Sequence, residues 1–468
     1  MSTSAERQLG DRIARMLYRD PDYIDDPVLG EYVQGIWQRL MAGARQRGEL
    51  PPELDERFAW DVVLGRDRSV NAFALPGGYM GVHLGLVAVV SSEDELASVL
   101  AHELSHVTQR HIVRIISRQG NQAPWLIGAM ILGALAASSN PGAASAMIVG
   151  GQAAAVQGQL NFSRDMEREA DRVGYSVMTQ AGFDPRGFVG MFEKLQQANR
   201  FNDTGAFPYL RSHPLTTERI ADMQARQQLQ TRPDPLQLTM AHAMLAARAR
   251  MLANPEVDSL RAALLQAQAT TVAPMSPAQQ AGVMYAAVLA AMGLREYEQA
   301  QRWLERLQAV VRSDERAAYQ ARLLDAELAL AAADPRRAST LLQAAAPDAG
   351  LAVTRPVLFL RARAWTQSGQ AREAAERLQV WLASRPRDAQ AWQLLSAAYV
   401  AQGQTLRAVR AEAEVHAARL DYVAARDRLR AAQELARQGT GVDHVEASII
   451  DTRSRQIDLL LREQALER

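Results

Sequence analysis

The chain has 468 residues, in which 52 lysine and arginine residues balance 52 aspartate and glutamate residues, and it has no cysteine. Its length exceeds one ordinary hydrophobic core, so we expect two or three domains. The balanced charge gives no basis for binding nucleic acid or an anionic membrane surface. The lack of cysteine excludes disulfides, thiolate metal sites and a thiol nucleophile.

Two amphipathic helices are predicted at the start of the chain. Apolar residues recur at helical spacing from Leu9 to Leu17, which predicts a helix over residues 6–19. Asp26 is a suitable N-cap and Pro27 suits the first helical position, so a second helix should begin there. We expect both helices to pack against the domain that follows.

The chain then changes to the two-residue period of β-strands. Apolar residues alternate with others from Phe58 to Leu64, and residues 71–75 and 79–82 predict two further strands around a Pro-Gly-Gly turn. The edge of such a small sheet can bind an extended peptide as an additional strand. Asn71 either belongs to that edge or is an ordinary turn residue.

The strongest functional signal is a His-Glu-x-x-His motif formed by His102, Glu103 and His106. Ser92 followed by Glu95 is a capping-box pattern, so the motif lies on a helix. The two histidines then lie one turn apart on one face and can reach a single Zn²⁺, whereas Glu103 is rotated off that face and suits a base that activates water. The alternative is a helix face with two histidines and no metal.

A third metal ligand must come from another part of the chain. The position six residues after His106, where a metzincin has its third histidine, is Ile112. His111 is turned by about 140° from His106 around a helix, so we expect it to point away.

Residues 125–156 are almost wholly apolar except for a break at residues 138–142. An apolar run of about thirteen residues spans about 20 Å as a helix, which is less than the roughly 30 Å of a bilayer core. We expect a helical hairpin that packs in the core, covers the zinc cleft, or makes peripheral contact with a membrane or a membrane-protein client.

Glu167 and Asp171 are four residues apart on a helix predicted over residues 163–181, which ends at Gly182. One of the two carboxylates can bind zinc while the other orients a ligand. The alternative is an exposed helix whose acidic residues pair with neighbouring arginines.

A polar segment, residues 199–214, predicts a loop that carries His213. His213 could stabilise the oxyanion of a tetrahedral intermediate, bind zinc as a fourth ligand and hold an enzyme latent, or lie on the surface. Arg219 could likewise assist with the oxyanion or pair with Asp222.

Helical repeats are predicted after residue 235. Gly369 and Gly403 are 34 residues apart, as are Trp365 and Tyr399, and this is the period of tetratricopeptide (TPR) repeats. Such repeats stack into a solenoid whose concave face binds protein segments. The alternative is helical packing without a client.

Taken together, these motifs resemble the M48 family of gluzincin metallopeptidases, and especially its periplasmic, TPR-bearing branch. The resemblance is carried by the stretches His102–His106, Glu167–Asp171, Asn71–Ala74 and Ser212–Pro214. It implies one zinc ion per chain with His102, His106 and Glu167 as ligands. It also implies that Glu103 is the general base and Asp171 the supporting acid.

The resemblance also implies a substrate site and a cellular role. Asn71, Ala72 and Phe73 would contact the substrate, and His213 and Arg219 are further candidates for catalysis. The clients would be unfolded or misassembled proteins in the quality control of outer-membrane proteins, with the outer-membrane β-barrel assembly machinery as a partner.

We therefore expect a mainly α-helical protein with a small β-sheet. A zincin-like metallopeptidase domain would span residues 1–230, and an α-solenoid of TPR-type helix pairs would span residues 235–468. Residues 1–7 lack the apolar core of a signal peptide, but the branch is exported, so we expect a periplasmic protein supplied without its signal. The alternative functions are a zinc-bearing chaperone or scaffold with a latent site, and a purely structural repeat protein.

Overall fold

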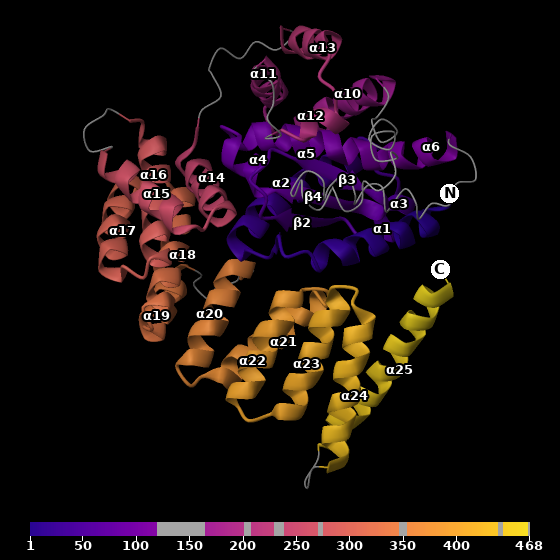
Figure 1. Ribbon diagram of the computed structural model, residues 1–468, viewed down its shortest axis with the longest axis vertical. Coiled ribbons are helices and arrows are strands. Elements are labelled where there is room, and N and C mark those ends of the chain that lie inside the picture. Colours follow the sequence, from indigo (N-terminus) through magenta and orange to yellow (C-terminus); the bar gives the residue numbers. More distant parts are fainter. Residues whose placement is uncertain are drawn as a thin grey trace. The chain divides into compact units, whose positions relative to one another are not determined.

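The computed structural model describes residues 1–118, 164–200, 207–228, 238–269, 275–345, 353–438 and 443–466. This part of the chain is mainly α-helical with one small β-sheet, as predicted (Figure 1). Among the described residues, no helix is both long and apolar enough to cross a bilayer. The predicted apolar hairpin at residues 125–156 lies outside the described residues.

Two helices begin the chain, as predicted. They are α1 (Thr3–Tyr18) and α2 (Pro27–Gln46), and they are followed by a short helix that was not expected, α3 (Pro52–Arg57). The predicted cap of α2 is present, because the Asp26 side chain accepts a hydrogen bond of 2.8 Å from the Leu29 N–H.

Four strands form the sheet, in the order β1-β2-β4-β3. They are β1 (Tyr23–Ile24), β2 (Asp61–Gly65), β3 (Ala72–Leu75) and β4 (Tyr79–His83). β2 and β4 are parallel, whereas β3 is antiparallel to β4 and forms one edge of the sheet. The turn between β3 and β4 needs Gly77 and Gly78, whose φ angles of 72° and 82° lie in the left-handed region. The three predicted strands are therefore confirmed near their expected positions.

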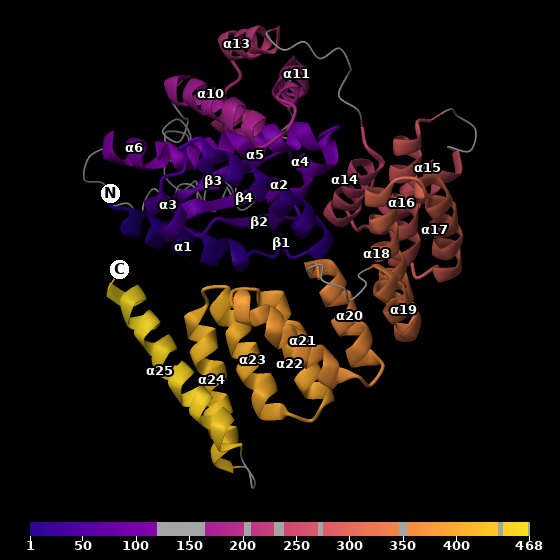
Figure 2. The ribbon, with the colours of Figure 1, turned by 180° about the vertical axis from the view of Figure 1, so that it is seen from behind.

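The helix with the His-Glu-x-x-His motif is α5 (Glu93–Thr108). It packs against β3 on one side and against α10 (Arg164–Gln180) on the other. Figures 1 and 2 both show α5 between the sheet and α10. Gly174 of α10 makes this approach possible, because a Cβ at that position would lie 3.1 Å from the backbone of Ala101 and His102.

Smaller helices surround this central layer. They are α4 (Leu84–Val89), α6 (His111–Arg118), α11 (Arg186–Arg200), α12 (Tyr209–Ser212) and α13 (Thr217–Gln228). Figure 2 shows α10, α11 and α13 on the same side of α5.

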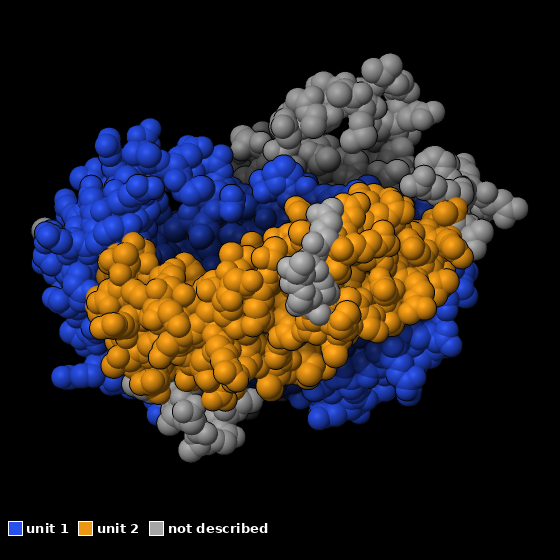
Figure 3. Space-filling view, turned by 90° about the horizontal axis from the view of Figure 1, so that it is seen from below, with its two compact units in different colours: residues 1–317 blue, residues 318–468 orange. Residues whose placement is uncertain are grey.

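The chain divides into two compact units, residues 1–317 and 318–468, which are coloured separately in Figure 3. The first unit also contains α14 (Met240–Ala253), α15 (Val257–Ala269), α16 (Pro277–Gly293) and α17 (Tyr297–Val311). Arg248 of α14 forms a buried ion pair of 2.6 Å with Asp26 at the start of α2. A compact unit can contain more than one domain, so the boundary expected near residue 230 stays a prediction.

Helix pairs make up the rest of the chain. They are α18 (Glu315–Ala331), α19 (Pro335–Ala345), α20 (Arg355–Gln367), α21 (Ala371–Ser384), α22 (Ala389–Ala401), α23 (Thr405–Ala418), α24 (Tyr422–Gln438) and α25 (His444–Leu466). α20 and α22 begin 34 residues apart, as do α21 and α23. Gly369 and Gly403 turn the chain after α20 and α22 with φ angles of 82° and 71°. The spacing agrees with the expected repeat, and the TPR class stays a prediction.

Candidate metal centre

Two imidazoles of α5 face the same point. His102 and His106 are buried, and their Nε2 atoms lie 2.9 Å apart. The helix begins at the predicted cap, where Ser92 Oγ accepts the Glu95 N–H at 3.1 Å. The Glu95 carboxylate accepts the Ser91 N–H at 2.6 Å, one residue before the position that a capping box uses. The predicted one-turn spacing of the histidines is therefore confirmed.

Glu167 of α10 reaches both imidazoles. Its two carboxylate oxygens lie 3.4 Å from His102 Nε2 and 3.4 Å from His106 Nε2. One turn along α10, Asp171 Oδ1 lies 2.9 Å from His102 Nδ1. The opposite face of α10 is different, because the exposed Asp165 pairs with Arg168 at 2.7 Å. The expected salt-bridged surface and the inward-facing carboxylates thus occupy two faces of one helix.

His213, at the C-terminal end of α12, is the fourth member of the group. It is buried, with Nδ1 located 3.0 Å from Glu167 Oε1 and 3.3 Å from His102 Nε2. The ring of Tyr209 stacks on the His213 ring, with 4.6 Å between their centroids and 25° between their planes. The surface interpretation of His213 is therefore wrong, because the side chain packs inside the site.

The positions of these donors fit a tetrahedral metal ion. One donor atom from each of His102, His106, Glu167 and His213 lies within 4.8 Å of the others. A tetrahedral Zn²⁺ with bonds of about 2.0–2.1 Å requires its donor atoms to be about 3.3 Å apart. Five contacts within the group, which involve both oxygens of Glu167, measure 2.9 to 3.4 Å and are close to that value. Two imidazoles and a carboxylate are also donors that Zn²⁺ prefers.

Glu103 faces the same group from α5 but has a different environment. Its Oε2 atom accepts the Ala74 N–H of β3 at 2.9 Å. Its Oε1 atom is buried and has no hydrogen-bond partner among the described residues, and His213 Nε2 lies 3.4 Å away. A buried carboxylate oxygen without a donor is poised to accept a proton from a molecule that enters the site.

Burial and close charges shift the pKa values of these groups. Burial acts to lower the pKa of His102, but hydrogen bonds with Asp171 and Glu167 outweigh it and raise that pKa to about 9. Burial, together with the charge of His102, holds the pKa of His106 well below its ordinary value. Burial opposes ionisation of Glu167, but His213 and His102 hold its pKa well below the usual range. The centre therefore holds an ionised carboxylate beside the imidazoles, and a cation that binds His102 Nε2 would displace a proton from that ring.

Arg219 of α13 contacts the carboxylates of α10. Its guanidinium donates to both oxygens of Asp171, at 2.6 and 2.8 Å, and lies 2.7 Å from Glu167 Oε2. It also donates to the Pro214 carbonyl at 2.9 Å. The alternative pairing with Asp222 is wrong, because Asp222 pairs with Arg226 at 3.1 Å.

His111 lies against the site, contrary to the expectation that it points away. Its Nδ1 atom is 2.9 Å from His106 Nδ1, and its other ring nitrogen is 3.0 Å from Glu169 Oε2. The expectation was wrong because it assumed one continuous helix. α5 ends at Thr108, and the left-handed φ of 53° at Arg110 redirects the chain into α6.

The three expected substrate residues lie at the edge of the sheet. Ala72 and Phe73 belong to β3, and the Asn71 carbonyl accepts the His83 N–H of β4 at 3.0 Å. The turn interpretation of Asn71 is therefore wrong, because the residue continues the β3 pairing. Asn71 and Ala72 are also buried, so an incoming peptide would have to displace the groups that cover them.

Sequence reasoning did not find Tyr209 or Glu169. Tyr209 lies four residues before His213 on the same short helix, so that spacing was the signal that could have indicated their stacking. Glu169 contacts His111 across separate helices, and no short-range pattern shows that contact.

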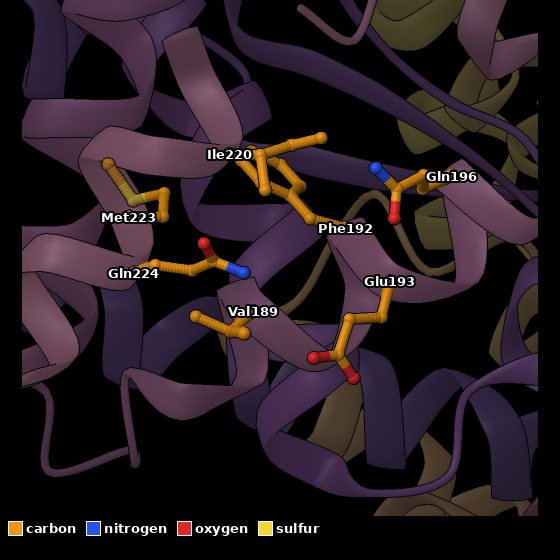
Figure 4. Close-up of a pocket in the computed structure, with 7 residues that line it drawn as sticks. All are labelled: Val189, Phe192, Glu193, Gln196, Ile220, Met223 and Gln224. Atoms are coloured by element: carbon orange, nitrogen blue, oxygen red, sulfur yellow. The ribbon is translucent and has the colours of Figure 1, made fainter. Parts of the chain in front are cut away.

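A separate hollow lies between α11 and α13 (Figure 4). It is lined by Val189, Phe192, Glu193, Gln196, Ile220, Met223 and Gln224. None of these residues is a member of the metal-binding group. The guanidinium of Arg219 lies 5.3 Å from the Phe192 ring centroid, so the wall of the hollow also packs against the arginine that holds Asp171.

Comparison with known proteins agrees with this geometry. Residues 30–227 match the model of Peptidase family M48. The β-barrel assembly-enhancing protease of Escherichia coli K12 is 32% identical over 429 residues, which are 90% of this chain and 82% of that protein. The chain belongs to peptidase family M48.

Two further relatives support membership of the M48 family. A protein of Vibrio cholerae named as a beta-barrel assembly-enhancing protease is 35% identical over 298 residues, which are 64% of this chain and 59% of that relative. The mitochondrial metalloendopeptidase OMA1 of Saccharomyces cerevisiae is 26% identical over 196 residues, which are 41% of this chain and 54% of that relative. As a member of the M48 family, this protein is a metallopeptidase that hydrolyses peptide bonds in protein substrates.

Proposed function

We propose that this metallopeptidase is a zinc-dependent endopeptidase whose metal is held by His102, His106 and Glu167. The observation that carries the proposal is the convergence of these three buried side chains from α5 and α10, with donor separations of 2.9 to 3.4 Å. Asp171 supports the arrangement by accepting the Nδ1–H of His102, which leaves Nε2 free to bind the metal.

When it is bound, zinc would supply Lewis-acid polarisation of the substrate carbonyl and would make water a stronger nucleophile near neutral pH. Glu103 takes the proton of the attacking water on its free Oε1 atom and passes that proton to the leaving amine. The Ala74 N–H fixes the other carboxylate oxygen, so the base keeps one orientation through both transfers.

His213 is proposed to act as a fourth ligand that keeps the enzyme latent. Its Nδ1 atom lies among the other donors, 3.3 Å from His102 Nε2 and 3.0 Å from Glu167 Oε1, so it would take the place that water needs on the metal. Stabilisation of the oxyanion would require His213 first to leave this position. Arg219 is proposed to position Asp171 and Glu167, since its donors are directed at those carboxylates.

The substrate is proposed to bind as an extended strand along β3, where Asn71, Ala72 and Phe73 form the sheet edge. Pairing through backbone atoms recognises an extended conformation more than a particular sequence. This suits clients that are unfolded or misassembled proteins.

The names of the relatives support a proposal for the biological setting. Two of them, from Vibrio cholerae and Escherichia coli, are named as β-barrel assembly-enhancing proteases. We propose that this protein acts in the periplasm on outer-membrane β-barrel proteins or on their assembly machinery, with the TPR-type helix pairs binding clients or partners.

The second candidate function is a zinc-bearing chaperone or scaffold with a latent active site. It is favoured by one observation, the presence of His213 as a fourth donor in the cluster. The two functions differ in whether His213 ever leaves the metal.

The test is cleavage of unfolded casein by purified protein, in the wild type and in a His213→Ala background. We expect a chelator to abolish cleavage and one equivalent of zinc to restore it. Glu103→Gln should bind the same amount of zinc without cleaving. Cleavage by metal-free protein, or by Glu103→Gln, would contradict the proposal, and failure of both backgrounds to cleave would favour the chaperone.

A further inference from the structure

A hydrogen-bonded chain runs from His106 to the surface of the protein. His106 Nδ1 lies 2.9 Å from His111 Nδ1, and His111 Nε2 lies 3.0 Å from Glu169 Oε2. Arg114 Nη1 then donates to the same Glu169 oxygen at 2.7 Å. The two histidines have fully buried side chains, whereas Glu169 and Arg114 are partly exposed.

We propose that His111 is a positioning residue for the metal centre, held in turn by Glu169. The inference rests on the proposed function, in which His106 binds the metal through Nε2. A neutral imidazole that binds a metal through Nε2 carries its proton on Nδ1 and donates that proton to a neighbouring acceptor. The nearest ring nitrogen to that proton is His111 Nδ1.

The protons in this chain can be assigned without conflict. His111 accepts from His106 on Nδ1, so its own proton lies on Nε2, where the Glu169 carboxylate accepts it. Arg114 balances the charge of that carboxylate. Glu169 thus fixes the tautomer of His111, and His111 fixes the tautomer of His106. The lone pair of His106 that would bind the metal therefore stays on Nε2.

This arrangement parallels the support of the first histidine. His102 has its Nδ1 atom 2.9 Å from Asp171, which Arg219 holds. His106 has an imidazole in place of the carboxylate, with a carboxylate and an arginine one step further away. Both imidazoles of α5 are therefore held through Nδ1, one by a carboxylate and the other by a second imidazole.

The turn that places His111 is itself held by distant contacts. Arg110 adopts a left-handed φ of 53°, a conformation that is unfavourable for a non-glycine residue. Its guanidinium donates twice to the buried Glu6 of α1, at 3.0 and 2.8 Å, and once to the Met1 carbonyl. The strain is offset by these contacts, and the result is that α6 begins with His111 beside His106.

The experiment compares zinc retention and cobalt spectra of four variants with the wild type. His111→Leu removes the acceptor for His106, and Glu169→Ala removes the acceptor for His111. His111→Asn is the conservative variant, because its side-chain oxygen falls close to the position of Nδ1. His242→Leu is the matched control, since His242 is also a buried, hydrogen-bonded histidine of the first unit and contacts Tyr32 and Val90 instead of the metal-binding group.

We expect His111→Leu to release zinc to a chelator about 10- to 100-fold faster than the wild type, and Glu169→Ala to show a smaller increase. His111→Asn should recover most of the retention, and His242→Leu should match the wild type. The visible spectrum of the cobalt-substituted protein should change in His111→Leu and not in His242→Leu. In ¹⁵N-histidine spectra of the zinc-loaded wild type, His106 should carry its proton on Nδ1.

Equal zinc retention in His111→Leu and the wild type would overturn the inference while leaving the proposed function intact. A wild type that binds no metal would overturn both. If His111→Leu does not fold, the other two variants still test the inference. Poor zinc retention in His111→Asn, together with wild-type retention and cobalt spectra in Glu169→Ala, would show that His111 does not act as a hydrogen-bond acceptor for His106.

Discussion

The backbone N–H of Ala74 donates a hydrogen bond of 2.9 Å to the Glu103 carboxylate. This contact joins the edge strand β3 to the proposed base on α5. The register of β3 against β4 makes this contact possible. Asn71 pairs with His83, so the backbone N–H and C=O groups of Asn71 and of every second residue after it point towards β4. Ala74 faces the other way, towards α5.

Removing the Ala74 N–H should therefore impair the base. In Ala74→Pro no ladder bond is lost, but Glu103 loses a donor that is worth about 1.5–3 kcal/mol to a charged group. We expect kcat/KM for a peptide substrate to fall roughly 10- to 100-fold, with the zinc content unchanged. Ala74→Ser keeps the N–H and should behave like the wild type. A fully active proline variant would show that this contact does not support catalysis.

Replacing Arg219 should weaken the metal centre. In Arg219→Gln the buried Asp171 and Glu167 lose their guanidinium partner, which for a buried pair costs about 3–5 kcal/mol. We expect a lower free energy of unfolding and about 10- to 100-fold weaker zinc binding. Arg226→Gln is the control, because its pair with Asp222 is partly exposed and should contribute about 0.5 kcal/mol or less. Denaturant unfolding and zinc titration measure both variants, and equal effects would argue against a positioning role for Arg219.

Replacing His213 distinguishes its two proposed roles. If His213 occupies the position that water needs, His213→Ala should cleave casein faster than the wild type while retaining zinc on three protein ligands. If His213 stabilises the oxyanion in the resting arrangement, the same variant should lose activity by about 10²-fold or more. We expect the increase, because Nδ1 of His213 lies among the metal donors.

Acidification should loosen α14 from the body of the first unit. His242 of α14 contacts the Tyr32 hydroxyl at 2.7 Å and the Val90 carbonyl at 2.9 Å, and burial lowers its pKa. A histidine whose pKa is lowered by folding binds its proton more readily when unfolded. Neutral His242 therefore adds to the free energy of unfolding above its unfolded-state pKa of about 6.5. As the pH falls below that value, this contribution decreases by at most about 1.4 kcal/mol per pH unit. Hydrogen exchange of α14 at pH 7.5 and 5.5 measures this loss, and His242→Gln should show less change between the two pH values.

The sequence predicts the parts of the site that local periodicity controls. The helix that carries His102 and His106 follows from the Ser92 cap and the apolar spacing, and the four-residue step from Glu167 to Asp171 puts both acids on one face of α10. These short-range rules hold because each depends on one element only.

The same rules fail where distant contacts choose between local options. Arg219 has an acidic residue three positions along its own helix, but the buried carboxylate of Asp171 is the stronger partner. His111 was expected to continue α5, and no glycine marks the end of that helix. The turn depends on Arg110, which contacts Glu6 more than one hundred residues earlier in the chain. No pattern near residue 110 indicates that contact.

Zinc content is the most direct test of the central claim, which is that Glu167 completes a metal site with the two histidines of α5. The wild type and two variants of α10 should be saturated with zinc, dialysed and analysed for metal. We predict one zinc ion per chain in the wild type and in Asp165→Asn, which changes an exposed acid of the same helix, and far less than one in Glu167→Ala. A full equivalent of tightly held zinc in Glu167→Ala would contradict the account.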